Sequence, residues 1–190
     1  QPVVVSSAGS NDWNIQGPKN APDAINTIIV VETDGAPVGI EDDETILLVP
    51  NMQEQRLHVF EAKVEGGLSW GKGSPRDNGV VGWNKQAMEN GKVSWNVRVK
   101  EPLELDIDLV YVAVEGQHGG TYVVSVDGQA FNGTVETQPK PDSSKKVKYI
   151  PHALGTIHLA PGTHRIVIKG EKINAKELFM PSSLLFIKKP

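Results

Sequence analysis

The sequence contains no cysteine among its 190 residues. This absence excludes disulfide bridges, thiol nucleophiles and thiolate metal sites. Apolar runs of about 18 residues, which a transmembrane helix needs, are also lacking, so no membrane span is expected. The formal net charge is only −4. No basic stripe is interleaved with aromatic residues, which argues against nucleic acid as a partner.

The sequence does have regular alternation of apolar and polar residues. From Lys92 to Val99 this alternation places Trp95 on the apolar face, and Leu105 to Ala113 and Tyr122 to Val126 repeat it. Short alternating strands separated by turn signals predict an all-β antiparallel β-sandwich of the jelly-roll type. The residues expected to face inward are Val97, Ile107, Leu109, Tyr122 and Ile166.

The first part of the chain has fewer strand signals than the rest. Ile25 to Val31 and Thr45 to Val49 are short apolar runs, and Glu41 to Glu44 is an acidic cluster that we interpret as a solvated loop. We place the boundary between residues 54 and 55. Residues 1–54 are thus an N-terminal β segment and residues 55–190 a jelly-roll module. A helical period is nowhere strong, although Asn174 to Leu178 has the form of a single helical turn.

Three segments carry a resemblance to known proteins. Leu57 to Lys63 is a strand with an acidic residue, Asn78 to Trp83 is a Gly/Asn loop ending in tryptophan, and Gly91 to Val99 is an alternating strand. In this order they resemble carbohydrate-binding modules of families 6 and 35, over residues 57–188. Residues 21–50 more weakly resemble the small β domain that follows the barrel of family 29 α-L-fucosidases.

These resemblances together imply a non-catalytic module at the C-terminal end of a bacterial glycoside hydrolase, in particular an α-L-fucosidase. The implied partners are a glycan or polysaccharide and the catalytic domain of the same polypeptide. The implied location is periplasmic or extracellular, at the bacterial surface.

The resembled modules hold a structural calcium ion with two acids on the first strand and one near the last strand. Here Glu61 is present, but Lys63 replaces the second acid and Ser182-Ser183 the last. An ammonium group would repel Ca²⁺, so we expect no calcium and no other cofactor.

Two tryptophans beside Gly-rich loops are the candidates for ligand binding. An indole can stack on the apolar C–H face of a sugar. Trp83 also stands where the resembled modules place a stacking aromatic, and Trp70 would assist it. Asn84 and His118 could hydrogen-bond to sugar hydroxyls from neighbouring loops. Each of these polar residues could equally be an ordinary turn residue, and either tryptophan could simply close the end of the sandwich.

No arrangement suited to catalysis is evident. Asp106 and Asp108 share one face of a strand, so they are neighbours rather than partners across a cleft. The five histidines lack metal-ligand spacing. The alternative to a glycan-binding module is therefore a structural or protein-interaction sandwich without a glycan site, and an independent enzyme is disfavoured.

Overall fold

The chain forms two compact units, Gln1–Ile40 and Glu41–Pro190. The structure is a computed structural model, and it describes residues 3–7, 13–18, 20, 30, 32, 35, 45–72, 79–137 and 148–189. In the first unit β1 (Val4–Ser7) and β2 (Trp13–Gln16) pair antiparallel. The second unit thus begins before the boundary that the sequence suggested at residue 55. The strand expected at 25–31 lies, except for Val30, outside the described residues.

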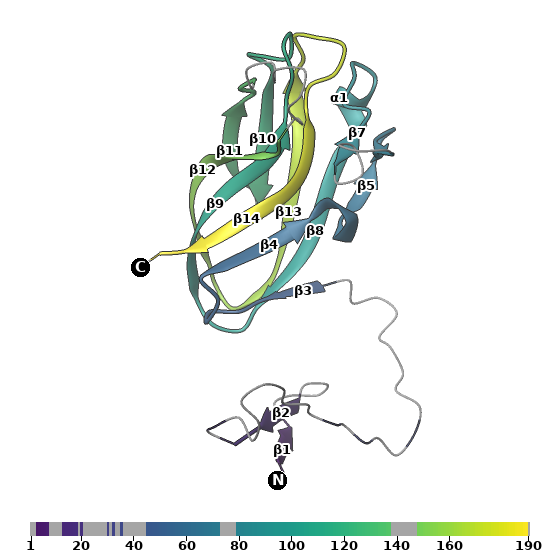
Figure 1. The fold of residues 1–190 in the computed structure, drawn as a ribbon. Coiled ribbons are helices and arrows are strands. Elements are labelled where there is room, and N and C mark those ends of the chain that lie inside the picture. Colours follow the sequence, from purple (N-terminus) through teal and green to yellow (C-terminus); the bar gives the residue numbers. More distant parts are fainter. Residues whose placement is uncertain are drawn as a thin grey trace. The chain divides into compact units, whose positions relative to one another are not determined.

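The second unit is an antiparallel β-sandwich, shown in Figure 1. Its larger sheet, called the β8 sheet here, has the strand order β11-β10-β13-β8-β3, and β5 also pairs with β8. All of these pairs are antiparallel except β3–β8, which is parallel. The strands are β3 (Thr45–Leu48), β5 (Lys63–Glu65), β8 (Lys92–Val99), β10 (Thr121–Val126), β11 (Gln129–Thr134) and β13 (Gly162–Lys172).

The facing sheet, called the β9 sheet here, has the order β12-β9-β14-β4. From β8 onward the chain passes repeatedly from one sheet to the other, which gives the jelly roll its crossing connections. A separate antiparallel pair, β6 with β7, lies before β8 in the chain. The strands are β4 (Glu54–His58), β6 (Ser69–Trp70), β7 (Val80–Val81), β9 (Leu103–Val112), β12 (Ile150–Leu159) and β14 (Met180–Lys188).

The segment read as one strand from Leu57 to Lys63 is interrupted. β4 ends at His58, a single 3₁₀ turn η1 covers Val59–Glu61, and β5 begins at Lys63. The backbone N–H of His58 donates a hydrogen bond to the Glu61 carboxylate over 2.9 Å. The interruption has a topological reason, because β4 pairs with β14 in one sheet and β5 pairs with β8 in the other.

One apolar core fills the space between the two sheets. Alternation along the strands supplies it, because every second side chain of a strand points to the same face. All five residues expected to face inward are buried, and so is Trp95. The largest fully buried side chains include Trp83, Tyr111, Tyr122, Phe179 and Phe186.

The helical turn lies elsewhere than expected. The short helix α1 covers Ala87–Asn90, whereas residues 174–177 form bends. Asn84 stabilises the turn that leads into the helix, because its side-chain oxygen accepts hydrogen bonds from the backbone N–H groups of Gln86 and Ala87. Within the described parts of the chain, no helix has the length and apolar character needed to cross a membrane.

Candidate functional site

Of the two candidate tryptophans, Trp70 is the one that the structure places at the surface. It lies on β6, which a turn at Gly66-Gly67 joins to β5. Both glycines have positive φ angles, 71° and 85°, and a Cβ on Gly66 would lie 2.1 Å from the carbonyl oxygen of Asn90. The turn therefore requires glycine there. The Trp70 side chain is 54% exposed, and its indole N–H donates to the Val59 carbonyl over 3.2 Å.

An open surface cavity of about 400 Å³ lies beside this ring. Its size is within the range of small-ligand sites, roughly 300–1,000 Å³. Three apolar side chains form most of the wall, with one ammonium and one hydroxyl group among them. Such a wall can contact the apolar face of a sugar and hydrogen-bond to its hydroxyls. The cavity is lined by Ala62, Lys63, Val64, Leu68, Ser69 and Trp70.

Lys63 is the charged residue at this cavity. Its ammonium nitrogen lies 3.5 Å from Glu65, whose other carboxylate oxygen lies 3.3 Å from Lys92. Burial alone would raise the pKa of Glu65, but the hydrogen bonds and ion pairs with Lys92 and Lys63 outweigh it, so this pKa is lowered. Glu65 therefore remains ionised at neutral pH, and two lysines share its single negative charge.

Trp83 does not belong to this site. Its side chain is completely buried, packs edge-on against Phe179 with ring centroids 5.3 Å apart, and donates from its indole N–H to the Val80 carbonyl. A buried ring offers no face to a ligand, so the structure assigns Trp83 to the core rather than to sugar stacking. The preceding Gly82, with φ of 92°, allows the loop to turn this ring inward.

Asn84 and His118 are both exposed but act locally. Asn84 stabilises the turn before α1, as described above. The His118 carbonyl accepts a hydrogen bond from the Asn174 side chain over 3.1 Å. Among the described residues, no hydrogen bond or ion pair joins either residue to Trp70, so these contacts do not bring the four predicted ligand residues into one site. Asn78, a further polar residue of the Gly/Asn loop, lies outside the described residues.

The expected absence of calcium stays a prediction. The described residues contain no group of three or more histidine and acidic side chains arranged to hold a metal ion. Glu61 already accepts the His58 backbone hydrogen bond, and Ser183 is fully buried, 3.4 Å from the Arg56 guanidinium. These contacts involve two of the three positions at which the resembled modules would supply acids.

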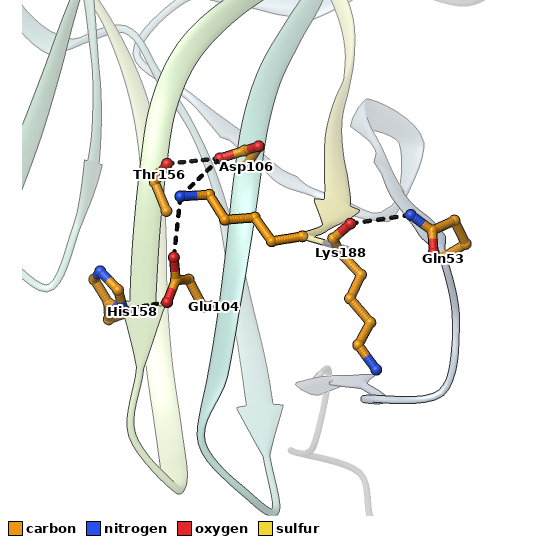
Figure 2. A network of polar contacts seen from close by, with 7 residues as sticks. Gln53, Glu104, Asp106, Thr156, His158 and Lys188 are labelled. Carbon is orange, nitrogen blue, oxygen red and sulfur yellow. Dashed lines mark hydrogen bonds and ion pairs between the residues drawn. The ribbon is translucent and has the colours of Figure 1, made fainter.

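The acidic residues of β9 lie on the outer face of the β9 sheet. Figure 2 shows Asp106 accepting a hydrogen bond from the Thr156 hydroxyl over 2.6 Å, and Glu104 lying 3.5 Å from His158. Burial and the charge of Asp106 raise the pKa of Asp108, although both residues remain partly exposed. Among the described residues, by contrast, the lining of the Trp70 cavity includes no carboxylate.

Sequence reasoning missed Lys63 and Ser69 as residues of the site. It interpreted Lys63 only as a lost calcium ligand. A signal was available, because both residues flank the Gly66-Gly67 turn within a few positions of Trp70. That turn joins β5 directly to β6. Leu57–Lys63 has the pattern of one continuous strand, which hid the start of β5 at Lys63.

Comparisons with known proteins bear on the fold. No model of a known protein family matches the chain, and no curated protein sequence matches it significantly. Solved structures do match. A Podospora anserina GH26-CBM35 β-(1,4)-mannanase superimposes with a TM-score of 0.53 at 14% identity, covering 73% of this chain and 28% of the mannanase chain.

Two other solved structures match the chain with similar TM-scores. An Arthrobacter globiformis T6 isomalto-dextranase in complex with panose has a TM-score of 0.50 at 18% identity, covering 72% of this chain and 24% of that chain. A Bacillus thuringiensis Cry1Da tryptic core variant has a TM-score of 0.57 at 13% identity, covering 76% and 25%. The chain thus spans about a quarter of the length of these proteins. At such identities the similarity establishes the sandwich fold alone.

Proposed function

We propose that the second unit is a non-catalytic carbohydrate-binding module that binds a glycan at the Trp70 cavity. The observation that carries the proposal is the exposed indole ring of Trp70, held by its hydrogen bond to Val59 beside an open, largely apolar cavity. A fixed aromatic ring needs little ordering when it binds a sugar. The fold, which this chain shares with a structure named as containing a family 35 module, supports the same proposal.

The wider context is part of the proposal. We infer that the module accompanies the catalytic domain of a bacterial glycoside hydrolase in the periplasm or at the cell surface. The resemblance of residues 21–50 to the family 29 domain would make that enzyme an α-L-fucosidase. The three structures named above do not include such an enzyme. The coding sequence upstream of Gln1 tests this part, because a catalytic barrel of family 29 should precede it.

The binding site is tested by titrating neutral plant and host oligosaccharides, first on a glycan array and then by calorimetry. Trp70→Ala should weaken binding about five- to thirtyfold, because one stacked ring contributes about 1–2 kcal/mol. Phe60→Ala is the matched control, since Phe60 is 62% exposed and does not line the cavity. Binding that survives Trp70→Ala would exclude this site. No binding to any glycan would favour the structural or protein-interaction sandwich.

A further inference from the structure

The outer face of the β8 sheet, called the cationic face here, carries an excess of positive charge. Residues opposite each other in an antiparallel pair point to the same side. The β8–β13 register places Lys92 opposite Lys169, and the β5–β8 register places Glu65 opposite Lys92. In the paired parts of these three strands the outward positions hold five cations and one carboxylate, Glu65. The cations are Lys63, Lys92, Arg98, Arg165 and Lys169.

The described carboxylates at this face are already engaged. Glu65 is shared between two lysines, as described above. At the end of β10, one oxygen of Asp127 accepts the Arg165 backbone N–H over 2.9 Å and the other lies 2.6 Å from His164. At the edge of the face, Glu61 accepts the His58 N–H. Among the described residues, no ion pair joins the Arg165 guanidinium or the Lys169 ammonium group to a carboxylate, although the whole chain has a net charge of −4.

A small polar cavity lies within the cationic face. β3 and β5 both pair with the edge of β8 that is opposite β13, β5 along residues 92–94 and β3 along residues 96–99. Near the junction of these two pairings a cavity of about 170 Å³ combines two cations and one carboxylate, that of Glu61, with an amide and a hydroxyl group. It is lined by Glu61, Lys63, Ser94, Trp95, Asn96 and Arg165.

We propose that the cationic face binds an acidic polysaccharide, with one anionic sugar residue seated in this cavity against Lys63 and Arg165. The site is distinct from the Trp70 cavity, although Lys63 contributes to both. Between the cations, Asn96 and Thr163 are exposed and offer neutral groups to sugar hydroxyls. Charge complementarity attracts the polymer to this face.

The spacing of the charges favours a polysaccharide over nucleic acid. Lys92 and Arg98 are six residues apart on one strand, a distance of about 20 Å at roughly 3.3 Å per residue. Duplex DNA carries a charge about every 1.7 Å along its axis. Proteins that bind single strands stack bases on aromatic side chains. The paired outward positions of β5, β8, β10 and β13 hold no aromatic residue. Sparse cations with hydroxyl and amide groups between them suit a sparsely charged sugar polymer.

The test measures retention of the complete chain on immobilised polygalacturonate, heparin and neutral dextran at increasing salt concentration. The double variant R165Q/K169Q removes two cations of the face. Its affinity for the acidic polymers should fall about two- to thirtyfold at low salt, the range for two exposed ion pairs. The salt dependence should also become shallower, because fewer counterions are released. The charge-matched control is K85Q/K176Q, at two exposed positions outside the strands of the β8 sheet.

Each outcome of this test either supports or overturns the proposal. Retention on heparin alone would identify a sulfated polymer and retention on polygalacturonate alone a carboxylated one, and either result supports the proposal. Equal loss in both double variants, equal affinity for single-stranded DNA, or no retention of the wild type would overturn it. Trp70→Ala should leave retention on the acidic polymers unchanged, and R165Q/K169Q should leave neutral-glycan binding unchanged. Failure of this inference can therefore be distinguished from failure of the Trp70 site.

Discussion

The β8 sheet and the β9 sheet enclose the same core, but their outer faces carry opposite charges. The cationic face holds five cations and one carboxylate in its paired strands. The outer face of the β9 sheet, called the acidic face here, carries four carboxylates: Glu54, Glu104, Asp106 and Asp108. Figure 2 shows part of this acidic face, where Glu104 and Asp106 lie on one strand beside His158 and Thr156.

The two outer faces also differ in the ion pairs that their charged side chains form. On the acidic face Lys189 lies 3.0 Å from Glu104 and 3.9 Å from Asp106, and Arg56 lies 3.5 Å from Glu54. On the cationic face one carboxylate, Glu65, serves two lysines. Among the described residues, the acidic face thus holds several internal ion pairs, whereas Arg165 and Lys169 on the cationic face form no ion pair with a carboxylate. A modest net charge can conceal two surfaces suited to different partners.

The largest expected effect on stability comes from comparing an inward-facing residue of β9 with its outward-facing neighbour. Ile107 is fully buried, and its neighbour Asp106 points outward. Ile107→Ala should lower the free energy of unfolding by about 2–5 kcal/mol, because it leaves a cavity. Asp106→Ala should cost only about 1 kcal/mol, since it loses one hydrogen bond, that to Thr156. Urea unfolding of both variants measures the difference. Equal losses would contradict the assignment of the two faces.

The next largest effect is the pH dependence of stability, which we compare for one histidine in each sheet. In the β8 sheet, both ring nitrogens of His164 lie within hydrogen-bonding distance of acceptors, Asp127 at 2.6 Å and the Ala160 carbonyl at 2.7 Å. Burial lowers the pKa of His164, but the hydrogen bonds to Asp127 and Ala160 outweigh it and raise this pKa above its ordinary value of 6.5. Burial raises the pKa of Asp127, but its bonds to Arg165 and His164 lower it below 3.8.

These two shifts define a pH window for stability. The contribution of His164 is fully present below pH 6.5 and is lost as the pH rises through its folded pKa. The contribution of Asp127 is present above pH 3.8 and is lost as the pH falls through its folded pKa. The pair should therefore stabilise most between these values, by about 1 kcal/mol. Thermal melts of wild type and His164→Gln should differ more at pH 5.5 than at pH 8.5.

His158 provides the control for this comparison. It lies on the acidic face, its side chain is 74% exposed, and it approaches only Glu104, at 3.5 Å. His158→Gln should change the melting temperature little at either pH, because exposed ion pairs contribute little. A pH dependence that persists in His164→Gln and disappears in His158→Gln would reverse the roles assigned to the two histidines.

A smaller effect is expected from the ion pairs of the acidic face. Lys189→Gln removes the cation beside Glu104 and Asp106. The loss of unfolding free energy should be small and should shrink in high salt, because these side chains are exposed. Urea titrations at low and high salt measure it. A loss that does not depend on salt would point to packing by the Lys189 stem instead.

The smallest expected effect is that of calcium. The cationic face contains Lys63 at the position of the missing acid, so Ca²⁺ should not bind there. Melting curves with calcium and with a chelator should coincide. A calcium-dependent rise of several degrees would show that other oxygens form a site. Loss of this rise in Asp106→Asn would locate that site on the acidic face.

Much of the fold could be predicted because alternation is a local signal. Trp95 and Tyr122 were assigned to the core correctly, since every second residue of a strand points to one side. The strands β8 and β9 were recognised nearly to their ends. The break at Val59–Glu61 was missed, because it reflects a change of pairing partner from β14 to β8. Neither partner is near it in the sequence.

The candidate site was predicted only in part. Trp70 is exposed as expected, whereas Trp83 is buried against Phe179, which is distant in the sequence. Both tryptophans follow glycine-containing loops, so local sequence cannot distinguish them. The two residues differ in exposure because the Trp83 ring points into the core of the sandwich, whereas the Trp70 ring points toward solvent. Lys63 and Ser69 come beside Trp70 through the turn at Gly66-Gly67.

The amino-acid order alone specified an all-β sandwich, its inward residues and its lack of cysteine chemistry, because each follows from composition or from a repeat of two residues. The cavities and the charge of each face depend on tertiary structure. Lys63, Arg98 and Arg165 come from three strands that are far apart in sequence, and only the pairing of β5 and β13 with β8 brings them to one surface. Charge on a face is a sum over neighbouring strands, and strand order is a long-range property of the fold.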